Sequence, residues 1–318
     1  MARFTLLTAA AALVASASAG PLRARQCNAP APGGNGTTIP TPGGPGASAT
    51  CPLSFDGRIP SNFTAAQFDD PANGIYTAGF VTGANLTLSQ VILFPENAPA
   101  SLFDKAGVTK PLEVTINDES IFAPSPDNVQ VGFRRTELLI ASNSGSDEST
   151  TGVKTLHFSV AKDAARPLNL AHEYQLVFLE DSTFSKNQFV LKTGAITGVD
   201  TVNPDSLTIF GNTDNFGTVL FTTPFTPDVF HNFALGLDFT ANTTQIFYSN
   251  GTTPLAPVTE PLPNDISGQG QYHFGVLKKG LGGNGDPKAG TQDVNTNEGI
   301  LYSGIFNEDS SAGCRTLA

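Results

Sequence analysis

The sequence carries little charge, and positive charge is especially scarce. Only 14 % of its 318 residues are charged, and 17 Lys and Arg stand against 28 Asp and Glu, which gives a formal net charge of −11. Soluble domains usually contain about 25 % charged residues. Nucleic-acid binding depends on clustered Lys and Arg, so this balance argues against nucleic acid as a partner.

Long hydrophobic runs are absent after the first twenty residues. A basic start (1–3), an apolar run (4–14) and a small-residue cleavage site (15–19) are typical of a secretory signal peptide. The apolar run is too short to span a bilayer as a helix. We therefore expect a signal peptide over 1–19 and a secreted, extracellular chain that no segment holds in a membrane.

Cysteine is rare, and its number is odd. Cys27, Cys51 and Cys314 allow at most one intramolecular disulfide. Cys51 opens the strand-rich region and Cys314 nearly ends the chain, so a Cys51–Cys314 bridge is expected, with Cys27–Cys51 as the alternative. A bridge requires Cα atoms roughly 4.4–6.8 Å apart. Glycosylation is also expected, because five Asn-X-Ser/Thr sequons occur, at Asn35, Asn62, Asn85, Asn242 and Asn250.

Helical periodicity is missing, whereas turn-forming residues are plentiful. The chain contains 32 Gly and 23 Pro, and residues 20–50 read as a Pro/Gly-rich linker or propeptide. From residue 51 onward apolar residues recur with period two, which predicts strands. These are 75–81, 86–94, 112–116, 129–140, 155–160, 173–179, 188–193, 206–210, 219–222, 230–239, 245–248, 272–277 and 300–306.

Many strands without crossover helices predict an all-β fold, an antiparallel two-sheet β-jelly roll (sandwich) with a concave substrate groove. No second change of composition occurs, so residues 51–318 are expected to form one domain. Alternation within the strands assigns faces. It places Phe178 in the core beside Tyr174 and Leu176. The polar residues it places on the opposite, groove-side face are Arg135, Glu137, Glu173, Gln175, Gln188, Lys192 and His273.

Motifs for nucleotide, metal and serine-nucleophile chemistry are lacking. The Gly-rich run 280–285 has no P-loop Lys-Ser/Thr pair, no Gly-X-Ser-X-Gly occurs, and the four histidines are not closely paired. Loops with Asp56, Asp69, Asp70 and Asp214 are candidates for a structural Ca²⁺, although solvated turns are the favoured interpretation. No cofactor or other metal is required by the expected chemistry.

Two glutamates on the predicted groove face suggest acid–base chemistry. Glycoside hydrolysis needs one carboxylic acid to protonate the leaving oxygen and one carboxylate on the other side of the sugar. Glu137 and Glu173 lie on separate predicted strands. Arg135 shares the face of Glu137 and should keep it ionised, which favours Glu137 as base and Glu173 as acid. A surface ion pair and a solvated glutamate are the competing interpretations.

Seven runs of sequence resemble, in order, a fungal family of secreted β-glucanases, glycoside hydrolase family 131. They are FDGRIP (55–60), QVGFRRTELL (130–139), GVKTLHFSV (152–160), LNLAHEYQLVFLE (168–180), NQFVLKTG (187–194), HNFALGLDF (231–239) and GQYHFGVLKK (270–279). The resemblance implies a β-jelly roll acting on β-1,3-, β-1,4- and β-1,6-linked glucans, with Glu137 and Glu173 as the catalytic pair. It also implies a site histidine, His273 or His231, of which alternation favours His273.

The chain departs from this family in its aromatic residues. It has no Trp, and Phe230 stands before His231-Asn-Phe, where the family pattern often has Trp. Sugar stacking must then depend on Phe and Tyr, which offer smaller faces.

The sequence therefore predicts a monomeric β-glucanase that binds β-glucan, with Glu137 and Glu173 catalytic and Arg135, His273, His231, Gln188 and Lys192 contacting substrate. Inversion of the anomeric centre is favoured. The alternatives are a polysaccharide lyase on the same jelly roll, whose basic residues would neutralise a uronate, and a non-catalytic glucan-binding lectin. A lyase product absorbs in the ultraviolet, and a lectin releases no reducing ends.

Overall fold

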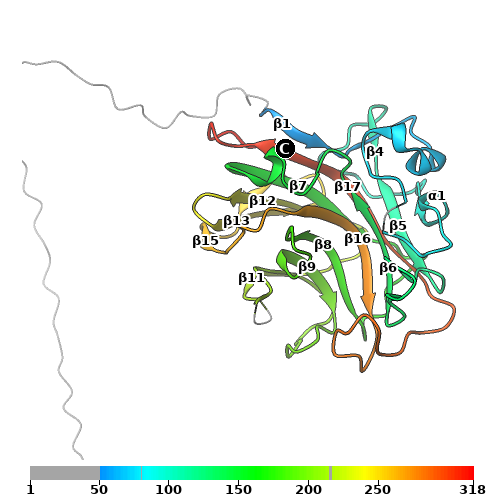
Figure 1. Ribbon diagram of the computed structural model, residues 1–318. Helices are drawn as coiled ribbons and strands as arrows, with labels where there is room; N and C mark the ends of the chain where they lie inside the picture. Colours follow the sequence, from blue (N-terminus) through cyan, green and yellow to red (C-terminus); the bar gives the residue numbers. More distant parts are fainter. Residues whose placement is uncertain (1–50, 80, 215–216) are drawn as a thin grey trace, which may run out of the picture. The chain divides into compact units, whose positions relative to one another are not determined.

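The structure is a computed structural model that describes residues 51–79, 81–214 and 217–318 (Figure 1). The expected signal peptide (1–19), the expected linker (20–50), Cys27 and Asn35 lie outside these residues. No helix in the described ranges is long and apolar enough to cross a membrane.

Two antiparallel sheets pack face to face as a β-jelly roll, and the smaller one has six strands in the order β11-β10-β9-β8-β16-β6. Figure 1 shows β9, β8, β16 and β6 running side by side through the lower half of the view. The strands of this sheet are β6 (Phe133–Leu139), β8 (Glu173–Glu180), β9 (Asn187–Gly194), β10 (Ser206–Phe210), β11 (Val219–Pro224) and β16 (Gln271–Lys279).

The larger sheet has the order β14-β13-β12-β7-β17-β5-β3, with β1 added to β17 and β15 to β13. Its strands are β1 (Leu53–Asp56), β3 (Ile92–Leu93), β5 (Leu112–Asn117), β7 (Val153–Lys162), β12 (His231–Asp238), β13 (Thr243–Asn250), β14 (Ala256–Pro257), β15 (Leu262–Pro263) and β17 (Asn297–Asp309). The remaining elements are the pair β2 (Ile59–Pro60) and β4 (Thr109–Lys110), the 3-10 helices η1 (Ala65–Asp69), η2 (Pro71–Asn73) and η3 (Glu148–Thr150), and the α-helix α1 (Leu88–Val91).

The core lies between the sheets and is built by period-two alternation. Phe158 of β7 and Phe233 of β12 enter it from the larger sheet, and Phe189 of β9 and Phe274 of β16 enter it from the smaller one. Burying an aromatic or branched side chain of this size contributes about 1.5–3 kcal/mol. The polar residues between these core positions must therefore point away from the core, which is what gives the smaller sheet a polar outer face.

Two segments predicted as strands have another structure. Residues 86–94 contain the single-turn helix α1 and only the two-residue strand β3. The reason is local: Thr87 and Gln90 form a capping box that starts a helix. In the predicted strand 75–81, the described residues form isolated bridges at Tyr76 and Val81, and the second of these joins Val81 to Glu137 of β6. This segment covers the open edge of β6.

The expected disulfide joins the two ends of the folded region. Cys51 and Cys314 are bonded, with Cα atoms 5.8 Å apart, so the pairing predicted from their positions is confirmed. The bridge closes a sequence separation of 263 residues. Such a long closed loop restricts the unfolded chain strongly.

Candidate active site

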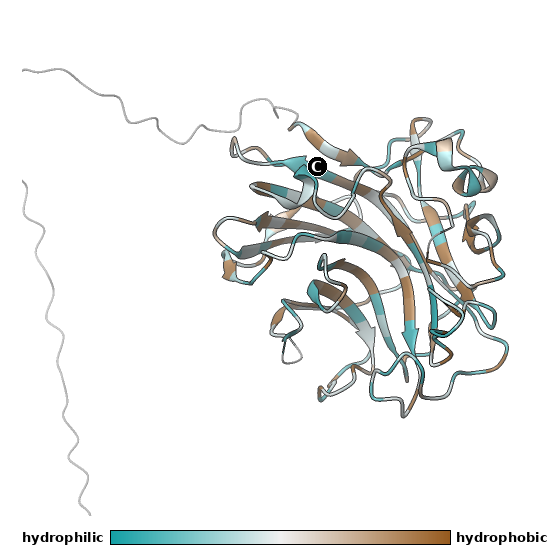
Figure 2. Cartoon of the chain, in the orientation of Figure 1, coloured by the Kyte–Doolittle hydropathy of each residue, from teal (hydrophilic) through white to brown (hydrophobic). Residues whose placement is uncertain are grey.

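The outer face of the smaller sheet carries a row of side chains from neighbouring strands. Arg135 on β6 lies opposite Leu277 on β16, Leu277 opposite Gln175 on β8, and Gln175 opposite Lys192 on β9. Thr208 on β10 continues the row beside Lys192. Figure 2 shows the hydrophilic tip of β16 at the end of this face. Residues far apart in the sequence are thus brought into one line across the sheet.

Glu137 and Glu173 flank this row on opposite sides. Glu137 lies opposite Gly275 on β16, whereas Glu173 starts β8 beside Tyr174, the partner of Lys278. The two Cα atoms are therefore separated by two strand spacings and by four residues along the strand, a distance of roughly 16 Å. Both side chains are buried. The row therefore passes between the two glutamates on the sheet face.

A β-bulge in β8 changes which residues share the face of the glutamates. The pairing of β8 with both neighbours shifts register between Gln175 and Val177. Leu176 and Val177 consequently both enter the core, and Phe178 turns outward, where its ring stacks on His273 with centroids 4.4 Å apart. The prediction that Phe178 lies in the main core is wrong, because alternation reverses after the bulge.

Glu137 is the most heavily paired carboxylate on this face. Arg135 donates to it through Nε at 2.8 Å and Nη2 at 2.7 Å, and His273 Nδ1 lies 2.8 Å from Oε2. Burial alone would raise the pKa of Glu137, but the charge of Arg135 and the hydrogen bond with His273 outweigh it and lower this pKa to about 2. Glu137 is thus held ionised beside a protonatable imidazole.

His273 lies between two carboxylates. Its Nε2 is 3.4 Å from Oε2 of Glu180 and has no hydrogen-bond partner, while its Nδ1 faces Glu137. Burial lowers the pKa of His273, but the hydrogen bond to Glu137 and the nearby carboxylate of Glu180 more than compensate, and the net effect is a raised pKa. His273 can therefore hold a proton next to Glu137.

Two lysines and a backbone amide surround Glu173. Lys192 Nζ lies 2.9 Å and Lys279 Nζ 2.8 Å from the same oxygen, Oε1, and the Thr197 N–H donates to Oε2 at 2.8 Å. Burial would raise the pKa of Glu173, but the charges of Lys192 and Lys279 lower it to about 2. Burial also lowers the pKa of Lys192 itself, so this ion pair is partly offset by desolvation.

The structure brings together Arg135, Glu137, Glu173, Lys192 and His273, but two other predicted residues lie elsewhere. His231 lies on β12 in the larger sheet, where its Nδ1 is 2.7 Å from the Tyr248 hydroxyl, so its expected place at this site is corrected. Gln188 is fully buried. Its amide donates to the carbonyl of Gln269 and accepts from the Gly268 N–H, so it anchors a loop and does not line the open face.

Other site residues were missed by the sequence argument. Lys279 is six residues after His273 on the same strand, so the two side chains are on the same face. The alternation that placed His273 on the outer face therefore also predicts Lys279 there. Glu180 follows the bulge in β8. Because the bulge reverses which residues face outward, simple alternation does not place Glu180 on the outer face. Thr197 contributes only its backbone N–H, for which the sequence holds no signal. Phe230, the residue that takes the place of an expected Trp, is fully buried with Ala161 and Leu301 and presents no stacking face.

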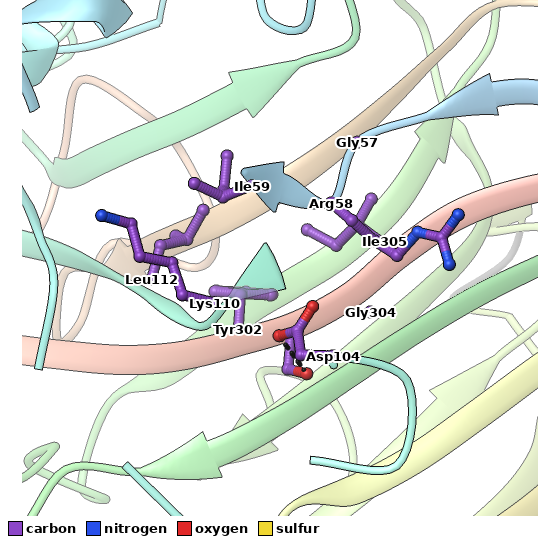
Figure 3. A pocket seen from close by; sticks show the side chains of 10 residues that line it. Gly57, Arg58, Ile59, Asp104, Lys110, Leu112, Tyr302, Gly304 and Ile305 are labelled. Atoms are coloured by element: carbon purple, nitrogen blue, oxygen red, sulfur yellow. Dashed lines mark hydrogen bonds between the residues drawn. The ribbon is translucent and has the colours of Figure 1, made fainter. Parts of the chain in front are cut away.

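Hollows occur near this face and away from it. One of about 420 Å³ lies at the β10–β11 end of the row, and Thr208 and Phe210 line it. Another lies beside β17, where Ser303 donates to Asp104 (Figure 3). The latter is only about 10 Å³, at the lower limit for one water molecule. It cannot hold a sugar.

The expected candidates for a calcium site are engaged in other contacts. Asp56 pairs with Arg58, Asp214 pairs with Lys186, and Asp70 accepts from the N–H of Ala72. Within the residues that the structure describes, no group of three or more His, Cys, Asp or Glu is arranged to hold a metal ion.

Comparison with known proteins identifies one family. Residues 53–313 match the family model described as the glycoside hydrolase 131 catalytic N-terminal domain. The fold resembles the crystal structure of a GH131 β-glucanase catalytic domain from Podospora anserina, with a TM-score of 0.64 and 21 % identity over 84 % of this chain and 98 % of that one. The GH131 catalytic domain from Coprinopsis cinerea gives 0.63 and 24 %, over 84 % and 97 %. No curated protein sequence matches the chain.

Proposed function

The chain belongs to glycoside hydrolase family 131 and is a glycoside hydrolase, and from this premise we propose that it hydrolyses β-1,3-, β-1,4- and β-1,6-linked glucans with Glu137 and Glu173 as its catalytic pair. One observation carries the proposal. Two buried carboxylates flank a single row of side chains on one sheet face, and each is paired with cationic side chains. Acid–base cleavage of a glycosidic bond uses a pair of carboxyl groups, one on each side of the bond, and this pair supports the proposal.

The electrostatics support roles opposite to those expected from the sequence. The sequence favours Glu137 as the base because of Arg135. In the structure Glu173 is ion-paired with two ammonium groups, and its remaining contact among the described residues is a backbone N–H, so none of these neighbours supplies it with an acidic proton. Glu137, in contrast, lies next to a group that can supply a proton, because Nδ1 of His273 is 2.8 Å from its Oε2. We therefore assign Glu173 as the base and the Glu137–His273 pair as the acid. In this assignment the proton belongs to the hydrogen-bonded pair of Glu137 and His273 and not to either residue alone.

In the proposed reaction the Glu137–His273 pair delivers its proton to the glycosidic oxygen as the bond from that oxygen to the anomeric carbon breaks. Glu173 removes a proton from a water molecule, and the oxygen of this water attacks the anomeric carbon from the other side. The separation of the two strands supports inversion, because retention needs carboxyl groups only about 5–5.5 Å apart and inversion needs room for a water.

The test is a reducing-sugar assay on β-1,3-, β-1,4- and β-1,6-glucans. Glu137→Gln and Glu173→Gln should each lower turnover by several orders of magnitude while circular dichroism stays unchanged. Glu113→Gln is the matched control, because Glu113 is equally buried and paired with an arginine, Arg166, but lies in the larger sheet. Near-normal hydrolysis by either site variant would remove that glutamate from the mechanism. Proton NMR of the first-formed anomer decides between inversion and retention.

Ultraviolet absorbance of the products and a glucan-binding measurement, made beside the reducing-sugar assay, separate the other two functions. Products that absorb in the ultraviolet would make the protein a lyase, and glucan binding without reducing ends would make it a lectin. Secretion, a 1–19 signal peptide, a 20–50 linker, a catalytic domain over 51–318 and a monomeric state are further parts of the proposal. Glycosylation is supported by the exposure of Asn62, Asn85 and Asn250, and a mobility shift after endoglycosidase treatment tests it.

A further inference from the structure

Phe184 stands out among the aromatic residues of the structure. It lies in the loop between β8 and β9 and is 68 % exposed. Every other Phe or Tyr in the described ranges is buried or half-buried. Its backbone is left-handed, with φ 57°, a conformation that a bulky residue adopts rarely and at a cost. A glycine or asparagine would suit this backbone better, so a large ring at this position calls for a reason.

The turn around Phe184 is held rigidly. The buried Asp181 carboxylate accepts from the Thr183 hydroxyl at 3.0 Å and from the N–H and hydroxyl of Ser185 at 2.9 Å. The N–H of Phe184 donates to the Asp181 carbonyl at 3.0 Å. These bonds hold the backbone of the turn, so little backbone conformational entropy remains to be lost when a ligand packs on the ring.

A hollow of about 160 Å³ lies beside the ring, and serine, aspartate and glutamine residues contribute to its lining. Besides Phe184 it is lined by Ser144, Gly145, Ser146, Asp181, Ser182, Gly270 and Gln271. Gly270 is required for this shape, because its φ is 109° and a Cβ there would collide with the Glu180 carbonyl. Hydroxyl and amide groups therefore surround an open space next to an exposed aromatic face.

This hollow adjoins the candidate active site. Gln271, in its lining, is the cross-strand partner of Glu180 and lies two residues from His273 on the same strand and face. Glu180 in turn approaches His273 at 3.4 Å, and His273 contacts Glu137. A bound chain that leaves the Glu137–His273 pair in this direction reaches the hollow directly.

We propose that Phe184 and this hollow form a distal subsite that binds a glucosyl unit of the β-glucan chain, an inference that rests on the proposed function. The C–H face of a pyranose packs on an aromatic ring, and its hydroxyls pair with serine hydroxyls and amide groups. The chain has no Trp, so an exposed Phe is the stacking residue available to it here. Short oligosaccharides that do not extend beyond His273 would not use this subsite.

The experiment compares Phe184→Ala, Phe184→Tyr and Phe184→Gly with the natural protein in two assays. The first is affinity electrophoresis in gels containing soluble β-1,3- or β-1,4-glucan. The second measures kcat and KM on the polymer and on a series of oligosaccharides. Val108→Ala is the matched control, because Val108 is 62 % exposed and lies beside β4, away from the smaller sheet.

Phe184→Ala should weaken polymer binding about five-fold, which corresponds to about 1 kcal/mol, and raise KM for long chains without changing kcat. Phe184→Tyr should restore binding. Phe184→Gly should bind as weakly as Phe184→Ala but melt no lower than the natural protein, because glycine tolerates a positive φ. A role that is only structural would not separate binding from melting in this way.

The outcomes separate the subsite from the proposed function. Equal gel retardation of Phe184→Ala and the natural protein, or an equal effect on short and long chains, overturns the subsite. If Phe184→Ala is retarded less than the natural protein, but the natural protein releases no reducing ends, the subsite is supported and the hydrolase proposal is overturned. Failure of the natural protein to be retarded by any glucan overturns the subsite on its own.

Discussion

The two lysines that hold Glu173 ionised predict a shift of the pH profile when one of them is removed. Lys192 and Lys279 contact the same carboxylate oxygen at 2.9 and 2.8 Å. Together they bring the pKa of Glu173 from its ordinary 4.5 to about 2 although burial acts in the opposite direction. A difference of this size corresponds to about 3 kcal/mol in favour of the ionised form.

Lys279→Met should remove about half of this stabilisation, and the pKa of Glu173 should rise by about one pH unit. If Glu173 is the base, the acidic limb of the kcat/KM profile moves upward by the same amount. Lys192→Met should move the limb by at least a similar amount, because the charge of Lys192 also lowers the pKa of Glu173. Lys186→Met, which breaks only the exposed pair with Asp214, serves as the control.

The same pair of pKa values predicts how stability depends on pH. The pKa of Glu173 is lower in the folded than in the unfolded protein, so its contribution is present above pH 4.5 and is lost as the pH falls from about 4.5 to about 2. The difference in the free energy of unfolding between Lys279→Met and the natural protein should therefore be about 1–2 kcal/mol at pH 7 and shrink toward zero near pH 2. Urea unfolding at several pH values measures it. An acidic limb that stays in place, or a stability difference that is the same at every pH, refutes the reasoning.

Three further predictions concern other parts of the structure. Tyr302→Phe should lower the free energy of unfolding by about 1–3 kcal/mol in urea, because its hydroxyl meets two buried carbonyls at the β8 bulge, at 2.8 and 2.6 Å; unchanged stability would mean that the bulge does not need it. Cys51→Ser, which removes the bond to Cys314, should lower the free energy of unfolding by about 2–5 kcal/mol. Calorimetry with and without reductant checks this. Because the neighbouring carboxylates raise the pKa of His273, His273→Asn should lower kcat about 10²- to 10⁴-fold and abolish the alkaline limb of the pH profile. A limb that persists would place the acid elsewhere.

Much of the fold could be predicted from local pattern. Alternation of apolar residues located most of the strands of both sheets, since a half-buried strand must place every second side chain in the core. The same rule put Glu137, Lys192 and His273 on one outer face, and the positions of Cys51 and Cys314 predicted their bond. These inferences hold because they depend on neighbours in the chain or on its two ends.

The remainder depended on contacts between distant residues. A bulge in β8 reversed the parity of Phe178 and Glu180, and the local pattern showed no sign of it, because Leu176 and Val177 are both apolar. Strand order brought Lys192 and Lys279 beside Glu173, and the charges of these two lysines lower the pKa of the carboxylate. The sequence by itself determined the class of fold and the residue types on the groove face. Only the tertiary structure decided which charges meet there, because register between strands is set by packing across the whole sandwich and not by the order of residues along one strand.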